Sequence, residues 1–182
     1  MVIKNKIEGY KKREELNLNR FHEGLFHKGE IEKVEGFLNK YNVEYYAVRS
    51  INIVGYKLSI KVPRDLVVDE IANHNSFTLS VSSHNYTDNL LLIGDVKIET
   101  NNNVWLWASK KEYPKGKDKT PDYNLCTDIF DKKLSHIKGF NDIYKYVIDK
   151  NLINVIVEFA VYDKAVGINN ETVVVFEIRT DY

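Results

Sequence analysis

Cysteine, proline and long hydrophobic runs are scarce in this 182-residue chain, which has one cysteine and three prolines. A single cysteine, Cys126, excludes an internal disulfide and a cysteine-ligated zinc site. No stretch of about 18 apolar residues occurs, as a membrane-spanning helix needs. The lysine-rich start, Met1 to Lys12, lacks the apolar stretch of a secretory signal. We therefore expect a cytoplasmic protein that does not engage a membrane.

Net charge is absent as well, because 26 Lys and Arg balance 26 Asp and Glu. A protein that holds nucleic-acid backbones needs an excess of positive charge, so dedicated nucleic-acid binding is disfavoured. Hydrophobic residues make up 43% of the chain, which is enough to form a core. The length is typical of one domain, and we predict a single domain over residues 1–182.

Complete catalytic motifs are missing too. The sequence contains neither of the glycine-rich phosphate loops, G-x-x-x-x-G-K-[S/T] and G-x-G-x-x-G, and neither H-E-x-x-H nor a C-x-x-C pair. A Cys126 nucleophile would need a histidine neighbour, so we interpret this residue as a buried structural thiol. These absences favour a protein that is not an enzyme.

A helical period of hydrophobic residues marks the first part of the chain. Ile31, Val34 and Leu38 recur at three- and four-residue steps with charged residues between them, which predicts an amphipathic helix. Further along, Thr127 is expected to cap one helix and Asn141 to start another.

The hydrophobic period changes to two in several segments, which predicts strands. Two antiparallel strands are expected over residues 43–62, a hairpin over 90–109, and two closing strands over 154–162 and 171–182. Strands and helices do not alternate one by one, which disfavours an open parallel sheet. The predicted fold class is α+β, a mainly antiparallel sheet with helices packed on one face.

The closing strands carry the most informative charges. Alternation places Glu177 and Arg179 on one face of the last strand, together with Val173 and Val175. If Glu158 of the preceding strand lies opposite Glu177, two carboxylates share one site, which could bind a hard cation such as Mg²⁺ or hold a proton. Alternatively, Arg179 neutralises one carboxylate in an ordinary cross-strand pair.

The segments 155–161 and 173–179 resemble the last hairpin of ATP-grasp enzymes. In that family the first strand offers an acidic or amide side chain, and the second a glutamate followed two residues later by asparagine, which together hold magnesium on the ATP phosphates. The resemblance implies Glu158 and Glu177 as metal ligands and Mg²⁺ and ATP as cofactors. Arg179 stands where asparagine is expected.

Two further interpretations concern single residues. The segment Ile60 to Pro63 resembles the ATP-grasp strand whose lysine contacts nucleotide phosphates, which implies that role for Lys61. The Glu177-x-Arg179 spacing is also similar to half of a metal-nuclease motif with Asp163, expected in a turn, as partner acid. The balanced charge argues against a nuclease.

A second group of candidates suits a protein partner. The two indoles of Trp105 and Trp107 project from one face of a strand, either under the helices or as an exposed aromatic pair. We expect them in the core, since two exposed tryptophans promote aggregation. The lysine-rich segment 110–124 could bind an acidic partner or a phosphate group. The candidate contact residues are Trp105, Trp107, Tyr113, Lys115, Lys117 and Lys119.

Two functional hypotheses follow. The first is a cytosolic, non-enzymatic interaction or regulatory module that binds a partner protein, for example an accessory protein of a phage or mobile element, with no firm cofactor. The alternative is an ATP-grasp-like enzyme or nucleotide-binding domain that uses Mg²⁺ and ATP. The missing catalytic motifs favour the first hypothesis.

Overall fold

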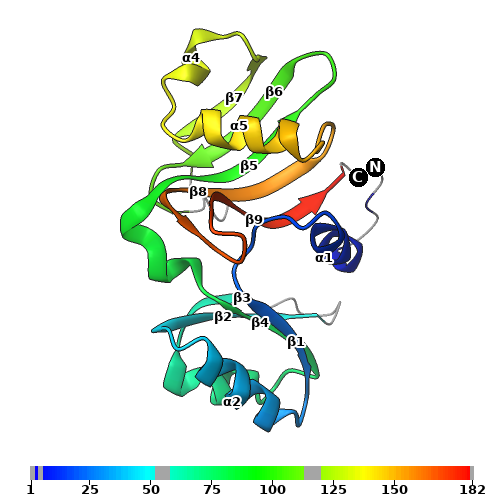
Figure 1. Cartoon of the computed structure of the whole chain (residues 1–182), viewed down its shortest axis with the longest axis vertical. Helices are drawn as coiled ribbons and strands as arrows, with labels where there is room; N and C mark the ends of the chain where they lie inside the picture. The colour runs from blue at the N-terminus through cyan, green and yellow to red at the C-terminus, as the bar shows by residue number, and fades with distance from the viewer. Residues whose placement is uncertain (1–2, 4–5, 52–57, 113–119, 181–182) are drawn as a thin grey trace. The chain divides into compact units, whose positions relative to one another are not determined.

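Two antiparallel β-sheets organise the chain in a computed structural model that describes every residue except 1–2, 4–5, 52–57, 113–119 and 181–182 (Figure 1). Contacts divide the chain into two compact units, one formed by residues 21–87 and the other by residues 1–20 and 88–182. The single domain expected for residues 1–182 stays a prediction. The α+β class is confirmed, because antiparallel sheets combine with several helices.

The smaller unit contains a four-stranded sheet in the order β1-β4-β2-β3. Its elements are β1 (Glu23–His27), α2 (Ile31–Lys40), β2 (Tyr45–Ser50), β3 (Leu58–Pro63), η1 (Arg64–Leu66), α3 (Val67–Ile71) and β4 (Ser76–Val81). Helix α2 forms as its period predicts, and it buries Val34 and Leu38 in one core with Phe77 and Leu79 of β4. A short 3₁₀ segment, η2 (Ser83–Asn89), follows the last strand.

The larger unit contains a five-stranded sheet in the order β7-β6-β5-β8-β9. Its elements are α1 (Lys6–Glu15), β5 (Leu90–Ile98), β6 (Asn103–Ser109), β7 (Tyr123–Asp128), α4 (Lys132–Ser135), α5 (Phe140–Asp149), β8 (Ile156–Val166) and β9 (Glu171–Arg179). Both predicted hairpins, β5–β6 and β8–β9, are confirmed.

One face of the larger sheet is sealed by helix α5, which lies across its strands (Figure 1). Val96, Leu106, Val157 and Ile178 are all at most 1% exposed and share a core with Ile143 of α5. Because strand side chains alternate between faces, the residues between these apolar positions lie on the opposite face. That opposite face therefore receives the polar residues of β5, β8 and β9.

Strand β9 is an edge strand, and the N-terminal segment covers it. The guanidinium of Arg13 on α1 donates to the backbone carbonyls of Val175, at 3.2 Å, and Phe176. Asn19 is fully buried, and its amide donates to the carbonyls of Val166 at 2.9 Å and Val173 at 2.7 Å. These bonds satisfy edge carbonyls that would otherwise remain open to another strand.

Two expectations about local structure were wrong. Thr127 does not cap a helix, because it lies on β7 and pairs with Val104 of β6. The helix cap is Asp131, whose carboxylate accepts from the backbone N–H of Lys133 at the start of α4. The hydrogen bond from Lys133 and one from the Thr127 hydroxyl lower the pKa of Asp131, against the opposing effect of burial.

Strict alternation along β9 was also wrong. Glu158 pairs with Glu177, but Phe159 pairs with Val175, so Phe176 is the extra residue of a β-bulge. The bulge turns Val175 into the core, away from the face that carries Glu177. A sequence pattern does not reveal such an insertion, since both strands are apolar on either side of it.

None of the helices in the described part of the chain has the length and hydrophobicity needed to cross a membrane. The cytoplasmic location stays a prediction.

A glycine at the centre of the larger sheet allows close packing of β5 on β6. A Cβ atom on Gly94 would overlap the carbonyl oxygen of Trp107 and lie 2.5 Å from the Cα of Ala108. We therefore expect Gly94→Ala to lower the free energy of unfolding by about 2–3 kcal/mol, because backbone atoms must move apart. Thermal melts followed by circular dichroism measure this loss. Gly36→Ala, with open space around the new methyl group, is the control; equal stability of the Gly94 variant would contradict the prediction.

Candidate functional site

Two parallel rows of side chains cross the face of the five-stranded sheet opposite α5. The first row, in strand order, is Asn124, Trp107, Asp95, Glu158 and Glu177. The second row is Cys126, Trp105, Lys97, Ile156 and Arg179. Neighbouring strands lie about 4.8 Å apart, so each side chain is within reach of the next one in its row.

Three carboxylates of the first row surround the guanidinium of Arg179, and we call these four residues the acidic cluster. Nη2 of Arg179 donates to Oδ2 of Asp95 at 3.0 Å. Nη1 lies 3.9 Å from Oε2 of Glu158 and 4.0 Å from Oε1 of Glu177. The cluster therefore combines three formal negative charges with one positive charge.

The acidic cluster lies at the boundary between the sheet and solvent. The side chain of Glu177 is 7% exposed, those of Asp95 and Glu158 are 18% and 20% exposed, and that of Arg179 is 26% exposed. Burial by itself lowers the pKa of Arg179. The charge and hydrogen bond of Asp95, followed by the charges of Glu177 and Glu158, outweigh burial and raise this pKa. Arg179 is therefore a permanent cation at this position.

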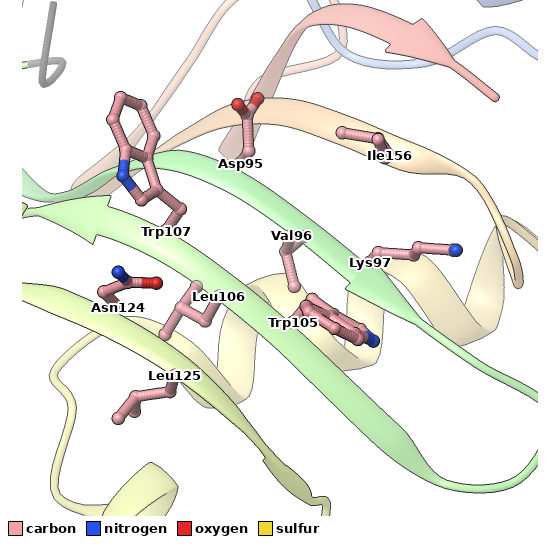
Figure 2. A pocket seen from close by; sticks show the side chains of 9 residues that line it. All are labelled: Asp95, Val96, Lys97, Trp105, Leu106, Trp107, Asn124, Leu125 and Ile156. Atoms are coloured by element: carbon pink, nitrogen blue, oxygen red, sulfur yellow. The ribbon is translucent and has the colours of Figure 1, made fainter. Parts of the chain in front are cut away.

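A shallow groove lies beside the acidic cluster, with a volume of about 230 Å³ (Figure 2). Its lining residues are Asp95, Val96, Lys97, Trp105, Leu106, Trp107, Asn124, Leu125 and Ile156. Figure 2 shows the indole of Trp107 and the carboxylate of Asp95 rising from the same side of the sheet. The groove therefore presents aromatic surface next to charged groups.

The expected core position of the two tryptophans was wrong. Trp105 is 51% exposed and Trp107 is partly buried, while Val104, Leu106 and Ala108 between and beside them are in the core. The helices cover the face of the sheet that carries these smaller apolar residues, so the indoles point the other way. Cys126, expected as a buried thiol, is exposed in the same row as Trp105.

Three further charged residues are found on β5, β3 and β8. Lys97 is in the second row and forms an ion pair with Glu99 at 3.1 Å, which lowers the pKa of Glu99. Lys61 is exposed on β3 of the smaller unit, with its ammonium 5.2 Å from the centre of the Tyr45 ring. Asp163, expected in a turn, is exposed on β8.

The lysine-rich segment falls outside the described residues for the most part. Tyr113, Lys115, Lys117 and Lys119, predicted to contact a partner, all lie in the range 113–119.

The sequence left the pairing of the two glutamates open and missed one member of the cluster. Glu158 and Glu177 are direct cross-strand partners, as the carboxylate hypothesis required. Arg179 lies near both, as the alternative interpretation required. Asp95 was not identified as a site residue, because its nearness to Arg179 depends on β5 lying beside β8, which no local pattern shows.

Searches by sequence found no match to a protein-family profile or to a curated protein. Comparison of structures found the fold of ATP-grasp-type ligases. One similar structure is the ADP complex of an N5-carboxyaminoimidazole ribonucleotide synthetase, at a TM-score of 0.55 and 12% identity, covering 98% of this chain and 45% of that protein. Another is D-alanyl-alanine synthetase A from Vibrio cholerae, at a TM-score of 0.51 and 12% identity, covering 97% and 54%. The chain thus spans about half the length of these proteins.

This likeness of fold corrects the functional hypothesis that the sequence favoured. A non-enzymatic partner-binding module was expected, but the structures found are ATP-grasp-type ligases. The ATP-grasp resemblance of the last hairpin is confirmed at the level of the fold, and it extends over nearly the whole chain. The absence of complete catalytic motifs favoured the first interpretation, and the structural comparison shows that this absence is compatible with an ATP-grasp-like fold.

The hydrogen bond between Asp95 and Arg179 gives a testable consequence for stability. Asp95→Asn removes the nearest negative charge from a mostly buried guanidinium, and we expect a loss of about 1–2 kcal/mol in the free energy of unfolding. Urea unfolding followed by tryptophan fluorescence measures this loss, because both tryptophans lie on the same sheet as the cluster. Asp163→Asn, an equal change at an exposed position, should alter stability by less than about 0.5 kcal/mol. Similar losses in both variants would contradict the prediction.

Proposed function

We propose that this chain is an ATP-grasp-like nucleotide-binding domain that binds an adenine nucleotide, with ATP as the first ligand to test, on the open face of its five-stranded sheet. The observation that carries this proposal is the direct pairing of Glu158 with Glu177 on the two closing strands. These are the positions that the ATP-grasp resemblance names, in a chain whose fold is ATP-grasp-like.

The open face offers chemistry that suits a nucleotide. Stacking of a base on an aromatic side chain is typically worth about 1–3 kcal/mol, and the groove carries two indoles. Arg179 and Lys97 supply positive charge in the same row as Trp105. From Trp107 to Glu177 the first row spans three strand spacings, about 14 Å, which accommodates an extended nucleotide.

Magnesium does not fit the acidic cluster as these side chains are arranged. Among the described residues, no three Asp, Glu, His or Cys side chains form a group suited to a metal ion. The carboxylates of Asp95, Glu158 and Glu177 face a guanidinium within 4.0 Å instead. We therefore propose that the chain's own side chains bind the nucleotide without a metal ion.

Intrinsic fluorescence provides a direct test, because the only two tryptophans of the chain line the groove. Titration with ATP or ADP should change the tryptophan emission in a saturable way. It should also raise the melting temperature, with a stabilisation of about 2.7 kcal/mol at a ligand concentration 100 times the dissociation constant. Trp107→Phe and Trp105→Phe identify which indole reports the ligand. Unchanged emission and unchanged melting with every nucleotide would refute the proposal.

Lys61 is the candidate phosphate contact of the smaller unit and needs its own test. If its ammonium binds a nucleotide phosphate, Lys61→Ala should weaken ATP binding by at least about fivefold, since a charge-assisted hydrogen bond is lost. Isothermal titration calorimetry measures the affinity. Lys33→Ala, which removes an exposed lysine of α2 that pairs with Glu30, is the matched control. Equal affinity of the wild type and the Lys61 variant would exclude a phosphate-binding role for Lys61.

A further inference from the structure

We infer that the guanidinium of Arg179 takes the place of a divalent cation in the acidic cluster, so that this site works without bound metal. The inference deepens the proposed function and rests on it only where it concerns nucleotides. Its geometric basis is independent of any ligand: one cation contacts three carboxylates from three adjacent strands, β5, β8 and β9.

Distances around Arg179 show that a positive charge already lies close to any cation that Glu158 and Glu177 could share. A magnesium ion needs oxygen ligands at about 2.0–2.1 Å in near-octahedral geometry. Nη1 of Arg179 lies 3.9 Å from Oε2 of Glu158 and 4.0 Å from Oε1 of Glu177, so an ion bound to both oxygens would lie within about 6 Å of the guanidinium. A divalent ion there would be repelled by the guanidinium, and the low exposure of Glu177, 7%, leaves little solvent to screen that repulsion.

The charges of the acidic cluster support the same conclusion. Three carboxylates on neighbouring strands repel one another and need a counter-charge. Arg179 supplies it through the hydrogen bond to Asp95 and the two longer contacts with the glutamates. An arginine cannot lose its proton under ordinary conditions and cannot dissociate from the chain. Arg179 therefore offsets part of the negative charge of the cluster in the same way at every magnesium concentration.

An ordinary surface ion pair does not account for this arrangement. Such a pair joins one exposed acid to one exposed base and contributes little to stability. Here Glu158 and Glu177 are paired directly across two strands, and Asp95 extends the row onto a third strand. The three acids converge on one residue that resembles, by position, the asparagine of a magnesium site. A single side chain, residue 179, thus decides whether the cluster holds a metal ion or an internal cation.

The experiment measures binding of Mn²⁺ alone, by electron paramagnetic resonance of the free ion, to the full chain. The wild type should show no saturable binding in the millimolar range. Arg179→Asn should bind Mn²⁺ at least about tenfold more tightly than the wild type, because the repelling charge is removed and an amide oxygen is added. Lys132→Asn, which removes an exposed lysine of α4 in the same unit, should behave like the wild type.

A second variant guards against misfolding of Arg179→Asn, which leaves three carboxylates without their cation. The double variant Asp95→Asn with Arg179→Asn has the same cluster charge as the wild type, yet keeps Glu158 and Glu177 as oxygen ligands. It should also bind Mn²⁺, and the ion should raise its melting temperature. Wild-type binding as tight as that of the variants would overturn the inference, and so would failure of both variants to bind.

The nucleotide proposal and the metal inference fail in different ways. If the chain binds no nucleotide, the Mn²⁺ measurements still decide the role of Arg179, because they use no nucleotide. If the wild type binds ATP, the affinity in excess EDTA should equal the affinity in millimolar Mg²⁺. A loss of affinity of about tenfold or more in EDTA would overturn the inference while supporting the proposed function.

Discussion

The contact between Arg179 and Asp95 is the interaction that allows three carboxylates to share one face of a β-sheet. Directly opposed like charges on neighbouring strands typically destabilise a pair by roughly 0.2–1 kcal/mol. Here the acids occur in sequence on β5, β8 and β9, so each has an acidic neighbour. A charge-assisted hydrogen bond at 3.0 Å, worth about 1.5–3 kcal/mol, offsets that repulsion. Without the guanidinium, the row would need another cation.

The opposite face of the same strands explains why the cluster keeps its register. Val96, Val157 and Ile178 are at most 1% exposed and pack under α5. A slip of one residue would bring apolar side chains to solvent and carboxylates into the core, which is far more costly than the repulsion within the row. Packing of the core therefore keeps the carboxylates close together, and Arg179 reduces the repulsion between them. The bulge at Phe176 allows β9 to satisfy both requirements.

Hydrophobic period and turn residues were sufficient to predict the hairpins and helix α2, but they left open the register that pairs Glu158 with Glu177. They did not predict β1 and β7, because these strands are short and their hydrophobic and polar residues alternate weakly. Both strands form by pairing with the edge of a neighbouring strand. The same patterns also misplaced the tryptophans, because two faces of a strand look alike when both carry large apolar residues. Asp95 entered the cluster only through the order of strands in the sheet, which is a long-range property of the chain.

A similar fold does not imply the same chemistry at residue 179. At 12% identity, the shared architecture shows how the strands are arranged, but it does not say which side chains or which cation occupy a site. That question depends on the few side chains in contact at the site, and here residue 179 is an arginine. A metal can leave, exchange or be limiting, whereas a guanidinium on the chain cannot. If the open face binds a nucleotide, occupancy of the site would follow nucleotide concentration alone, without the additional dependence on magnesium that a two-component ligand imposes.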